Sequence, residues 1–551
     1  MTGAFQNGDR RQDGRPKRNP LIPDAIAIPP EILARHRMRV LDPATAVRPK
    51  DGTRPFSTVY RTDTLLVPAG EVESLLPNPD ENTQNEINRE LGELGLELRP
   101  STEESWQGAV GRLPANLGVP IPLVRRDDRP ADRAPDPWAA LVLLRDRFGR
   151  RVQGFGLDHL VMSASLTVEG APVSHGGSVG GTPVSHGGSM GSGVALYTGS
   201  RNPVAMLMPQ PARPAAESLT GRRRPVVAVL DTGIGPHPWW SEQDPGDPII
   251  EVAQDFQDLL GQHEAGQPTM VEPSPLDDPY DVPDEFQPLL GLIDSHAGHG
   301  TFVSGLVHQL CPAARILSLR MLHGDGYSTE GALLLALNWL GDRVDDALET
   351  GETEKMVDVV SLSLGFYPET ADPLQVIQVL AAIDRLTTKG VLVVAAAGND
   401  ATTRPFMPAA FGRGAGSASD GVELLSAVGA RNAAGVTTAA FSNWGEWISR
   451  WAPGNALVST VPVWEGAAGA GIVYPDAAGL GPRLRTAPDP DDLTSGFAVW
   501  AGTSFATPVV AGLLADALAT DEYTVEASEG VGRAQRALIA ADAELARRRW
   551  Q

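Results

Sequence analysis

A run of five apolar residues, Val226–Leu230, constrains the fold of this chain most, because it ends in the polar sequence Asp231-Thr232-Gly233. Uninterrupted apolar runs rich in β-branched residues are typical of parallel strands that are buried on both faces. Thr232 and Gly233 are predicted to turn the chain sharply at the carboxyl end of this strand. Ligands of open α/β sheets bind at that edge. Asp231 is therefore predicted to lie at the ligand-binding edge of a parallel sheet.

Two further polar residues lie at the predicted starts of helices. His299 stands between two glycines and is followed by TFVSGLVHQL, in which the spacing of apolar residues predicts a helix packed on the sheet. Ser504 opens the segment SFATPVVAGLLADAL. Pro508 is expected in the first turn of that predicted helix, where its missing N–H removes no hydrogen bond. Both polar side chains are thus expected to be held rigidly beside the sheet.

These residue types together suit nucleophilic catalysis. A serine hydroxyl is a poor nucleophile at neutral pH, so an imidazole must take its proton and a carboxylate must fix the tautomer of that imidazole. A serine at a helix N-terminus also places its own N–H and the positive end of the helix beside a reacting carbonyl. Asn399, directly after the apolar run VLVVAAAG, is expected to donate the second hydrogen bond to an oxyanion. Asp231, His299, Ser504 and Asn399 are therefore the candidate catalytic residues.

Seven motifs carry a resemblance to a known family. In chain order they are DTGIG (231–235), HGTFVSG (299–305), SLSLG (361–365), VVAAAGN (393–399), FSNWG (441–445), APG (452–454) and GTSFATP (502–508). Their sequence and order resemble those of subtilisin-like serine peptidases, and the order Asp, His, Ser separates this family from other triad hydrolases. The resemblance extends from about Val226 to about Thr520. Ser304 stands where alanine is usual and Phe505 where methionine is common, but neither touches the proton-transfer chemistry.

The resemblance implies an α/β fold, with a doubly wound core built on a mainly parallel sheet. It also implies a serine endopeptidase that hydrolyses peptide or protein substrates through an acyl-enzyme. In that mechanism Ser504 attacks, His299 relays the proton and Asp231 orients His299, while Asn399 and the Ser504 N–H hold the oxyanion. Such peptidases bind the substrate as an added β-strand. The implied substrate-binding residues are Ser363, Leu364 and Gly365 on one edge, Ala396, Ala397 and Gly398 on the other wall of the primary pocket, and Gly324, Asp325, Gly326 and Tyr327 on the opposite edge.

The primary pocket is expected to be roomy and mostly apolar, because Gly365, Ala396 and Gly398 are small. Cleavage after Leu, Phe, Tyr or Met is therefore predicted. By the same resemblance Asp400 lies at the mouth of the pocket. It should add a mild preference for Arg or Lys, since an exposed ion pair contributes only about 0.2 to 1 kcal/mol.

Other interpretations of these residues remain open. A single DTG is also the fingerprint of aspartic peptidases, although the chain has no second D-T/S-G. His296 and His308 are rivals to His299, but His296 lacks a helical run directly behind it and His308 falls late in the predicted helix. At the level of function, the alternatives are a catalytically silent binding protein that retains the fold, and an esterase or peptide ligase that uses the same acyl-enzyme.

The predicted elements divide the chain into a disordered or extended lead (1–54), an α+β ferredoxin-like domain (55–169), a Gly/Ser/Pro-rich linker (170–221) and a subtilisin-like domain (222–551). Within the second part, segments 63–68, 80–95 and 96–100, and then 121–126, 136–148 and 157–168, repeat strand, helix, strand. This part resembles the intramolecular chaperone that precedes many subtilisin-like cores, and a permanent accessory domain is the alternative. The enzyme should remove a chaperone itself, by a cut between about Gly170 and Arg224.

Composition limits the partners and the location. The net charge of −23 disfavours nucleic acid and anionic membranes as partners and allows attraction of basic substrates, whereas the oligomeric state is left open. The polar N-terminus lacks the apolar segment of a signal peptide, and no stretch reaches about 18 apolar residues, so a cytoplasmic location is predicted. Cys311 is the only cysteine and is expected to be a buried structural thiol.

Three further features raise the question of metal binding. Residues 241–297 and 461–498 form acidic insertions, the second of which contains Asp489, Asp491 and Asp492. They could coordinate calcium, but they show no regular ligand spacing, so solvated loops at the rim of the cleft are favoured. The linker holds a duplicated PVSHGGS segment (172–182 and 183–193), for which flexibility is favoured over a histidine metal site. No metal ligand and no cofactor is therefore assigned.

Overall fold

The computed structural model describes residues 28–76, 85–126, 134–165, 201–219, 222–265, 276–283, 285–287, 292–370, 376–412, 424–466, 472–474, 483–485, 491–521 and 527–548. The duplicated PVSHGGS segments, Asp489 and the expected domain boundary at 169/170 lie outside the described residues. Within the described ranges, every helix is too short or too polar to cross a membrane.

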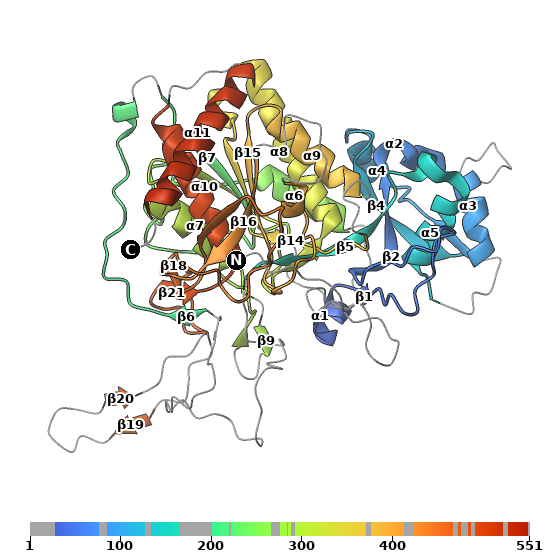
Figure 1. The fold of residues 1–551 in the computed structure, drawn as a ribbon, viewed down its shortest axis with the longest axis horizontal. Helices are drawn as coiled ribbons and strands as arrows, with labels where there is room; N and C mark the ends of the chain where they lie inside the picture. Colours follow the sequence, from blue (N-terminus) through green and yellow to red (C-terminus); the bar gives the residue numbers. More distant parts are fainter. Residues whose placement is uncertain are drawn as a thin grey trace, which may run out of the picture.

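The N-terminal unit contains an antiparallel sheet with the strand order β5-β2-β4-β3 (Figure 1). The strands and the two main helices between them are β2 (Val59–Pro68), α3 (Glu86–Leu91), β3 (Leu96–Leu98), β4 (Gly118–Arg125), α5 (Pro137–Phe148) and β5 (Gly156–Ser163). This connectivity and strand order are those of the predicted ferredoxin-like fold. Trp138, Leu141 and Leu144 of α5 lie in one buried cluster with Leu65 and Ile121 of the sheet.

Part of the predicted lead joins this unit. α1 (Pro30–Arg35) and β1 (Met38–Val40) lie within residues 1–54, for which a disordered or extended segment was expected. β1 pairs antiparallel with β2, and Met38 lies in a small buried cluster with Val59 and Leu160. This segment gains its structure from tertiary pairing, which its polar composition does not indicate.

The core of the larger unit is a fully parallel sheet with the strand order β17-β16-β15-β13-β7-β11-β8. The strands are β7 (Val226–Asp231), β8 (Ile250–Val252), β11 (Arg315–Arg320), β13 (Val359–Leu362), β15 (Leu392–Ala396), β16 (Leu425–Arg431) and β17 (Arg450–Pro453). The direction of strand addition reverses next to β7, because β11 lies on one side of it and β13 on the other. Asp231 thus ends a strand at the topological switch point, where α/β sheets bind ligands.

Helices cover both faces of this sheet, as the doubly wound prediction requires (Figure 1). α7 (His299–Leu310), α10 (Thr503–Ala519) and α11 (Ala527–Arg547) lie on one face, and α6 (Gln254–Ala265), α8 (Glu330–Thr350) and α9 (Ile377–Thr387) lie on the other. Successive side chains of β7 point to opposite faces of the sheet. Val227 and Val229 belong to the buried cluster of the first face, and Ala228 and Leu230 belong to that of the second. Burial on both faces accounts for the uninterrupted apolar run.

The start of α10 differs from the prediction at Pro508. The helix begins at Thr503, so Pro508 is its sixth residue and lies beyond the first turn. Its missing N–H would have donated to the carbonyl of Ser504, four residues earlier. The Ser363 hydroxyl donates to that carbonyl instead, at 2.7 Å. A contact from another strand end therefore satisfies the carbonyl that the proline leaves without a helical donor.

The first acidic insertion is not a solvated loop throughout, so that prediction is wrong for much of residues 241–297. β8 extends the main sheet, and α6 packs on one of its faces through Phe256 and Leu260. The buried apolar residues of these elements lie between polar stretches, which hides their periodicity in the sequence. Cys311 is buried as predicted, and burial raises the pKa of its thiol to about 12.

Short elements complete the described chain. They are α2 (Ala69–Val72), α4 (Glu104–Val110), β6 (Asn202–Pro203), β9 (Glu285–Gln287), β10 (Leu292–Ile293), β12 (Tyr327–Thr329), β14 (Leu364–Gly365), β18 (Leu457–Thr460), β19 (Ile472–Tyr474), β20 (Arg483–Arg485) and β21 (Phe497–Trp500). β12 and β14 matter for the site, because both pair with β5 of the N-terminal unit.

Candidate active site

Asp231 and His299 form a buried hydrogen-bonded pair. Asp231 ends β7 and His299 is the first residue of α7, and their side chains are 1% and 0% exposed. His299 Nδ1 lies 2.6 Å from Asp231 Oδ1, which also accepts the Thr232 N–H at 2.8 Å. A carboxylate partner keeps the proton on Nδ1 and leaves Nε2 able to accept one. The pair is therefore arranged as a general base held by a carboxylate.

Ser504 is the second residue of α10 and is fully buried. Its hydroxyl donates to the Ser363 carbonyl at 2.8 Å. His299 Nε2 lies instead 3.2 Å from the hydroxyl of Ser163, at the end of β5. In this structure the Ser504 hydroxyl is thus hydrogen bonded to the Ser363 carbonyl, and the His299 imidazole to the Ser163 hydroxyl.

Asn399 and the backbone of Ser504 form a two-donor site. Oδ1 of Asn399 accepts the N–H and the hydroxyl of Thr503, both at 2.9 Å, which fixes the orientation of the amide. Nδ2 of Asn399 then donates to the carbonyl oxygen of Ala164, and the Ser504 N–H donates to the same oxygen at 2.9 Å. Two convergent donors beside a serine hydroxyl have the geometry of an oxyanion hole.

The segment that reaches this site is the end of β5. Leu160–Met162 pair antiparallel with β12, and Met162 and Ser163 pair with Gly365 and Leu364 of β14. Figure 1 shows β5 extending from the N-terminal unit towards β14. Backbone bonds continue this pairing, because the Ser163 N–H donates to Gly326 O at 2.8 Å and the Ala164 N–H donates to Ser363 O at 3.0 Å. The chain therefore lies as a strand between the two edges that were predicted to bind substrate.

This placement brings a bond outside the predicted cleavage range beside Ser504. The carbonyl at the two-donor site belongs to the Ala164–Ser165 bond, which precedes the expected range of Gly170 to Arg224. Exposure of the linker suggested the later range, whereas the register of β5 against β12 and β14 decides which bond lies beside Ser504.

Apolar side chains pack around Ala164 and the glycines of the predicted primary pocket. Ala164 lies in a buried apolar cluster with Ala396, Tyr367 and Phe406. A Cβ added at Gly365 would come within 2.5 Å of the Phe406 ring, and one at Gly398 within 3.2 Å of it. Phe406 thus packs against both glycines, in space that the sequence-based prediction left open to a substrate side chain.

Asn443 organises the wall of this pocket. Its Oδ1 accepts the N–H groups of Asp400 and Thr402 at 3.0 and 3.2 Å, and its Nδ2 donates to the Ala397 carbonyl and the Tyr367 hydroxyl at 2.7 and 2.8 Å. Sequence analysis missed this residue, although it stands in the quoted FSNWG motif. An amide in a motif shared with a family was the signal that could have found it.

Asp400 is exposed, and its carboxylate accepts the Tyr367 hydroxyl. On the opposite predicted edge, Tyr327 pairs with Met162, and the carbonyl of Gly324 accepts the His296 N–H at 2.9 Å. Tyr367 therefore competes with any cationic side chain for Asp400.

The two rival histidines do not pair with Asp231. The ring of His296 lies 5.9 Å from that of His299, and its Nδ1 is hydrogen bonded to the Ser295 hydroxyl. Burial lowers the pKa of His296 to about 3 and the pKa of His308 to about 4. His299 is thus the histidine that the structure places at the carboxylate.

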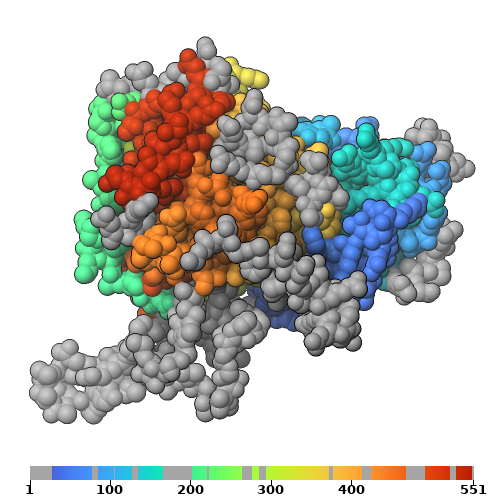
Figure 2. Space-filling view, viewed as in Figure 1, coloured from blue at the N-terminus to red at the C-terminus, as the bar shows by residue number. Residues whose placement is uncertain are grey.

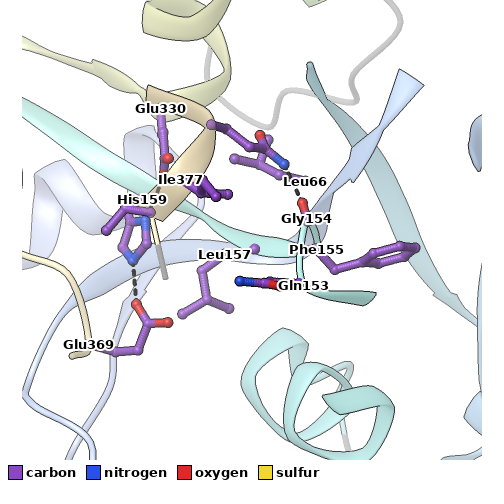
Figure 3. A pocket seen from close by; sticks show the side chains of 12 residues that line it. Leu66, Gln153, Gly154, Phe155, Leu157, His159, Glu330, Glu369 and Ile377 are labelled. Carbon is purple, nitrogen blue, oxygen red and sulfur yellow. Dashed lines mark hydrogen bonds and ion pairs between the residues drawn. The ribbon is translucent and has the colours of Figure 1, made fainter. Parts of the chain in front are cut away.

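Charged groups join the N-terminal unit to the larger unit. His159 of β5 is buried between Glu330 and Glu369, with Nδ1 2.5 Å and Nε2 2.8 Å from their carboxylates, beside a small cavity of about 20 Å³ (Figure 3). Burial alone would lower the pKa of His159, but the two carboxylates raise it to about 10. Figure 2 shows the N-terminal unit packed directly against the rest of the chain.

A second charged contact lies at the edge of the cleft. Arg35 Nη1 is 3.0 Å from Asp325 and 3.3 Å from Asp294, and His36 Nε2 is 2.8 Å from Asp325. Although burial favours the neutral carboxyl, His36 and Arg35 hold the pKa of Asp325 well below its usual range. The lead and β5 together thus cover this side of the cleft.

The acidic residues of the second insertion have protein partners where they are described. Asp491 forms an ion pair with Arg201 at 2.9 Å, and Asp492 accepts the N–H and the hydroxyl of Thr494. No group of three or more His, Cys, Asp or Glu side chains among the described residues is placed to hold a metal ion. These carboxylates therefore do not fit a calcium site, and no step of the chemistry is assigned to one.

Comparisons with known proteins agree with this geometry. The family model described as "Subtilase family" matches residues 222–545, which is more than half of the chain. A thermophilic serine proteinase of Bacillus sp. (strain AK1) is 29% identical over 211 residues, 38% of this chain and 44% of that protein. Subtilisin-like protease 3 of Pseudogymnoascus destructans is 31% identical over 196 residues, 33% of this chain and 42% of that protein.

The matched segments thus span less than half the length of these curated relatives. A solved cold adapted subtilisin-like serine proteinase aligns with 56% of this chain and 79% of its own, with 20% identity and a TM-score of 0.32. The family match covers every candidate catalytic residue, from Asp231 to Ser504. The chain belongs to the subtilase family.

Proposed function

We propose that this protein is a serine endopeptidase that hydrolyses peptide bonds through an acyl-enzyme. One observation carries the proposal: a peptide carbonyl, that of Ala164, accepts the Ser504 N–H and the Asn399 amide while its strand pairs on both sides. A binding protein would need the strand pairing alone. The convergent donors are useful where negative charge develops on a carbonyl oxygen.

The proposed chemistry follows from the contacts of each residue. The Ser504 hydroxyl leaves the Ser363 carbonyl and attacks the substrate carbonyl carbon, while its proton passes to His299 Nε2. Asp231 stabilises the imidazolium through Nδ1, and the imidazolium then protonates the leaving amine. Water repeats the sequence on the acyl-enzyme. Because His299 Nε2 is held by Ser163 in this structure, that hydrogen bond must open before the first step.

The same proposal gives the N-terminal unit a role as a bound segment that the enzyme cuts. β5 occupies both predicted substrate edges, and Val161 and Leu66 lie in the same buried cluster as Leu333 of α8. Until the Ala164–Ser165 bond is cleaved and the segment leaves, it excludes other peptides from Ser504. This favours the chaperone-like interpretation over a permanent accessory domain that leaves the cleft open.

Self-cleavage tests the proposal directly. Purified protein is expected to give one fragment that ends at Ala164 and another that begins at Ser165, because this bond lies at the two donors. Mass spectrometry of the fragments identifies the cut. The Ser504→Ala variant should stay full length, whereas Ser495→Ala, at an exposed serine outside the site, should cut normally. Wild-type protein that stays intact on long incubation and is not labelled by a fluorophosphonate at Ser504 would favour the silent binding protein.

A second prediction concerns the residue before the cut. Peptides with Ala at this position should be cleaved at least about 10-fold faster than those with Phe, because Phe406 and Tyr367 fill the pocket and extra volume in a packed site is costly. The Phe406→Leu variant should reduce this difference. Asp400→Asn should change the ratio of Arg to Ala cleavage by only a few fold. Competition between peptides in one mixture measures these ratios, and faster cleavage after Phe by the wild type would show that another surface forms the pocket.

A further inference from the structure

Asp281 comes from the first acidic insertion, yet it lies inside the molecule beside the candidate triad. It is 3% exposed, and its N–H donates to the carbonyl of Ile234 at 3.1 Å. The neighbouring turn makes room for it. A Cβ on Gly233, whose φ is +96°, would lie 2.7 Å from Pro279 O and 3.0 Å from Asp281 N. The glycine of the DTG motif thus allows this insertion to approach the catalytic carboxylate.

The carboxylate of Asp281 joins the turns that carry Asp231 and His299. Its Oδ2 accepts the Thr232 hydroxyl and the Gly298 N–H, both at 2.7 Å. The Thr232 hydroxyl oxygen in turn accepts the Gly300 N–H at 3.0 Å. Thr232 follows Asp231, and Gly298 and Gly300 flank His299. One buried carboxylate therefore connects the backbone on both sides of His299 to the residue after Asp231.

The start of α7 needs such a contact. Its N-cap residue is Gly298, which has no side chain to cap the helix and adopts φ +85°. Unsatisfied N–H groups at a helix start favour an acceptor, and a carboxylate is favoured further by the helix dipole. Asp281 accepts the Gly298 N–H from a segment 17 residues away in the chain, and the Thr232 hydroxyl, which it binds, accepts the Gly300 N–H. Together they take the place of a local cap at the helix that carries the candidate base.

Charges around Asp281 permit an ionised carboxylate there. Burial raises the pKa of Asp281 to about 6, and the negative charge of Asp231 acts in the same direction. The hydrogen bonds from Thr232 and Gly298 and the positive charge of Arg320 oppose this rise. Either protonation state leaves an oxygen of Asp281 able to accept a hydrogen bond.

We propose that Asp281 is a positioning residue, which holds His299 against Asp231 by binding the Gly298 N–H directly and the Gly300 N–H through Thr232. The proposal rests on the proposed peptidase function. A displacement of about 1 Å in such a constellation can lower the rate about 100-fold. Loss of Asp281 should therefore act on the chemical step and leave substrate binding, which uses β12 and β14, nearly unchanged.

Four variants test this on the self-processed enzyme: Asp281→Ala, Asp281→Asn, Thr232→Val and the double variant Asp281→Ala/Thr232→Val. Asp281→Ala should lower kcat about 10- to 100-fold per fluorophosphonate-titrated site, with KM within about twofold. Asp281→Asn retains an acceptor oxygen and should restore kcat to within about threefold of wild type. The double variant should be little worse than the worse single variant, because both changes break one path.

Asp278→Ala is the matched control, since Asp278 is an exposed carboxylate of the same segment and should give wild-type kcat. Unchanged kcat in Asp281→Ala would overturn the proposal. A fall in the number of titratable sites with unchanged kcat per site would also overturn it. So would a double variant in which the two single losses of kcat multiply in full.

A readout without turnover separates this proposal from the peptidase function. The low-field proton NMR signal of an Nδ1–H bonded to a carboxylate should be present in Ser504→Ala and in Asp281→Asn/Ser504→Ala. It should be weakened or shifted in Asp281→Ala/Ser504→Ala. An identical signal in all three would overturn the role of Asp281 whatever the activity. An inactive wild type with this pattern would remove the peptidase proposal and leave the positioning role intact.

Discussion

The His299→Ala variant is expected to lose about 10⁶-fold in kcat, the magnitude known when a base of this kind of triad is removed. Among the histidines that the structure describes, His299 is the one bonded to Asp231, and its Nε2 reaches the cleft, where it lies 3.2 Å from the Ser163 hydroxyl. Without it the Ser504 hydroxyl keeps its proton and its hydrogen bond to Ser363 O. Self-cleavage between Ala164 and Ser165 should stop for the same reason.

Two measurements check this prediction. A fluorophosphonate should label wild-type protein at Ser504, located by peptide mass spectrometry, and should fail to label His299→Ala. His263→Ala is the matched control, because His263 lies on α6, on the opposite face of the sheet from α7. Labelling of Ser504 that persists in His299→Ala at the wild-type rate would mean that another group takes the proton, and His299 would leave the mechanism.

The Asn399→Ala variant is expected to lose about 100- to 1000-fold in kcat with little change in KM. The two bonds from Thr503 fix Asn399 Oδ1, so its Nδ2 is held towards the carbonyl before the reaction begins. A donor fixed in this way stabilises the oxyanion more than the neutral carbonyl. The loss should therefore appear in the chemical step.

Asn399→Asp sharpens this test. It retains the acceptor for Thr503 but removes the donor and adds negative charge beside the oxyanion, so its kcat should fall below that of Asn399→Ala. Asn432→Ala, at a half-buried asparagine of the turn after β16, serves as the control. Steady-state kinetics with an alanine-containing peptide separate kcat from KM. A rise in KM at constant kcat would show that Asn399 contributes to substrate binding alone.

The position of each candidate catalytic residue could be predicted because local sequence governs it. The run Val226–Leu230 becomes β7, with Asp231 at its end, and His299 opens α7. The two strand-helix-strand repeats of the N-terminal unit also appear in the predicted order, although α3 spans only Glu86–Leu91 of the expected 80–95 and β5 ends at Ser163. Strand and helix propensities act over a few residues, so a single sequence contains them.

The surroundings of the candidate catalytic residues depend on packing between elements far apart in the sequence. Phe406 packs against Gly365 and Gly398. Asn443 and Asp281 enter the site through contacts that span 46 and 17 residues, so no local pattern marks them. The 241–297 insertion was predicted to be a solvated loop because its buried residues follow no single helix or strand periodicity. Their burial depends on contacts with distant segments.

The sequence by itself therefore determined the family motifs, the four candidate catalytic residues and the two αβ folds, because short-range patterns and motif order specify them. Only the tertiary structure decided three contacts. The Ala164 carbonyl accepts the Ser504 N–H, the Ser163 hydroxyl is hydrogen bonded to His299, and Asp281 accepts the N–H of Gly298, directly before His299. These contacts depend on the register of β5 against β12 and β14 and on the close approach at Gly233, both of which arise when distant segments pack together.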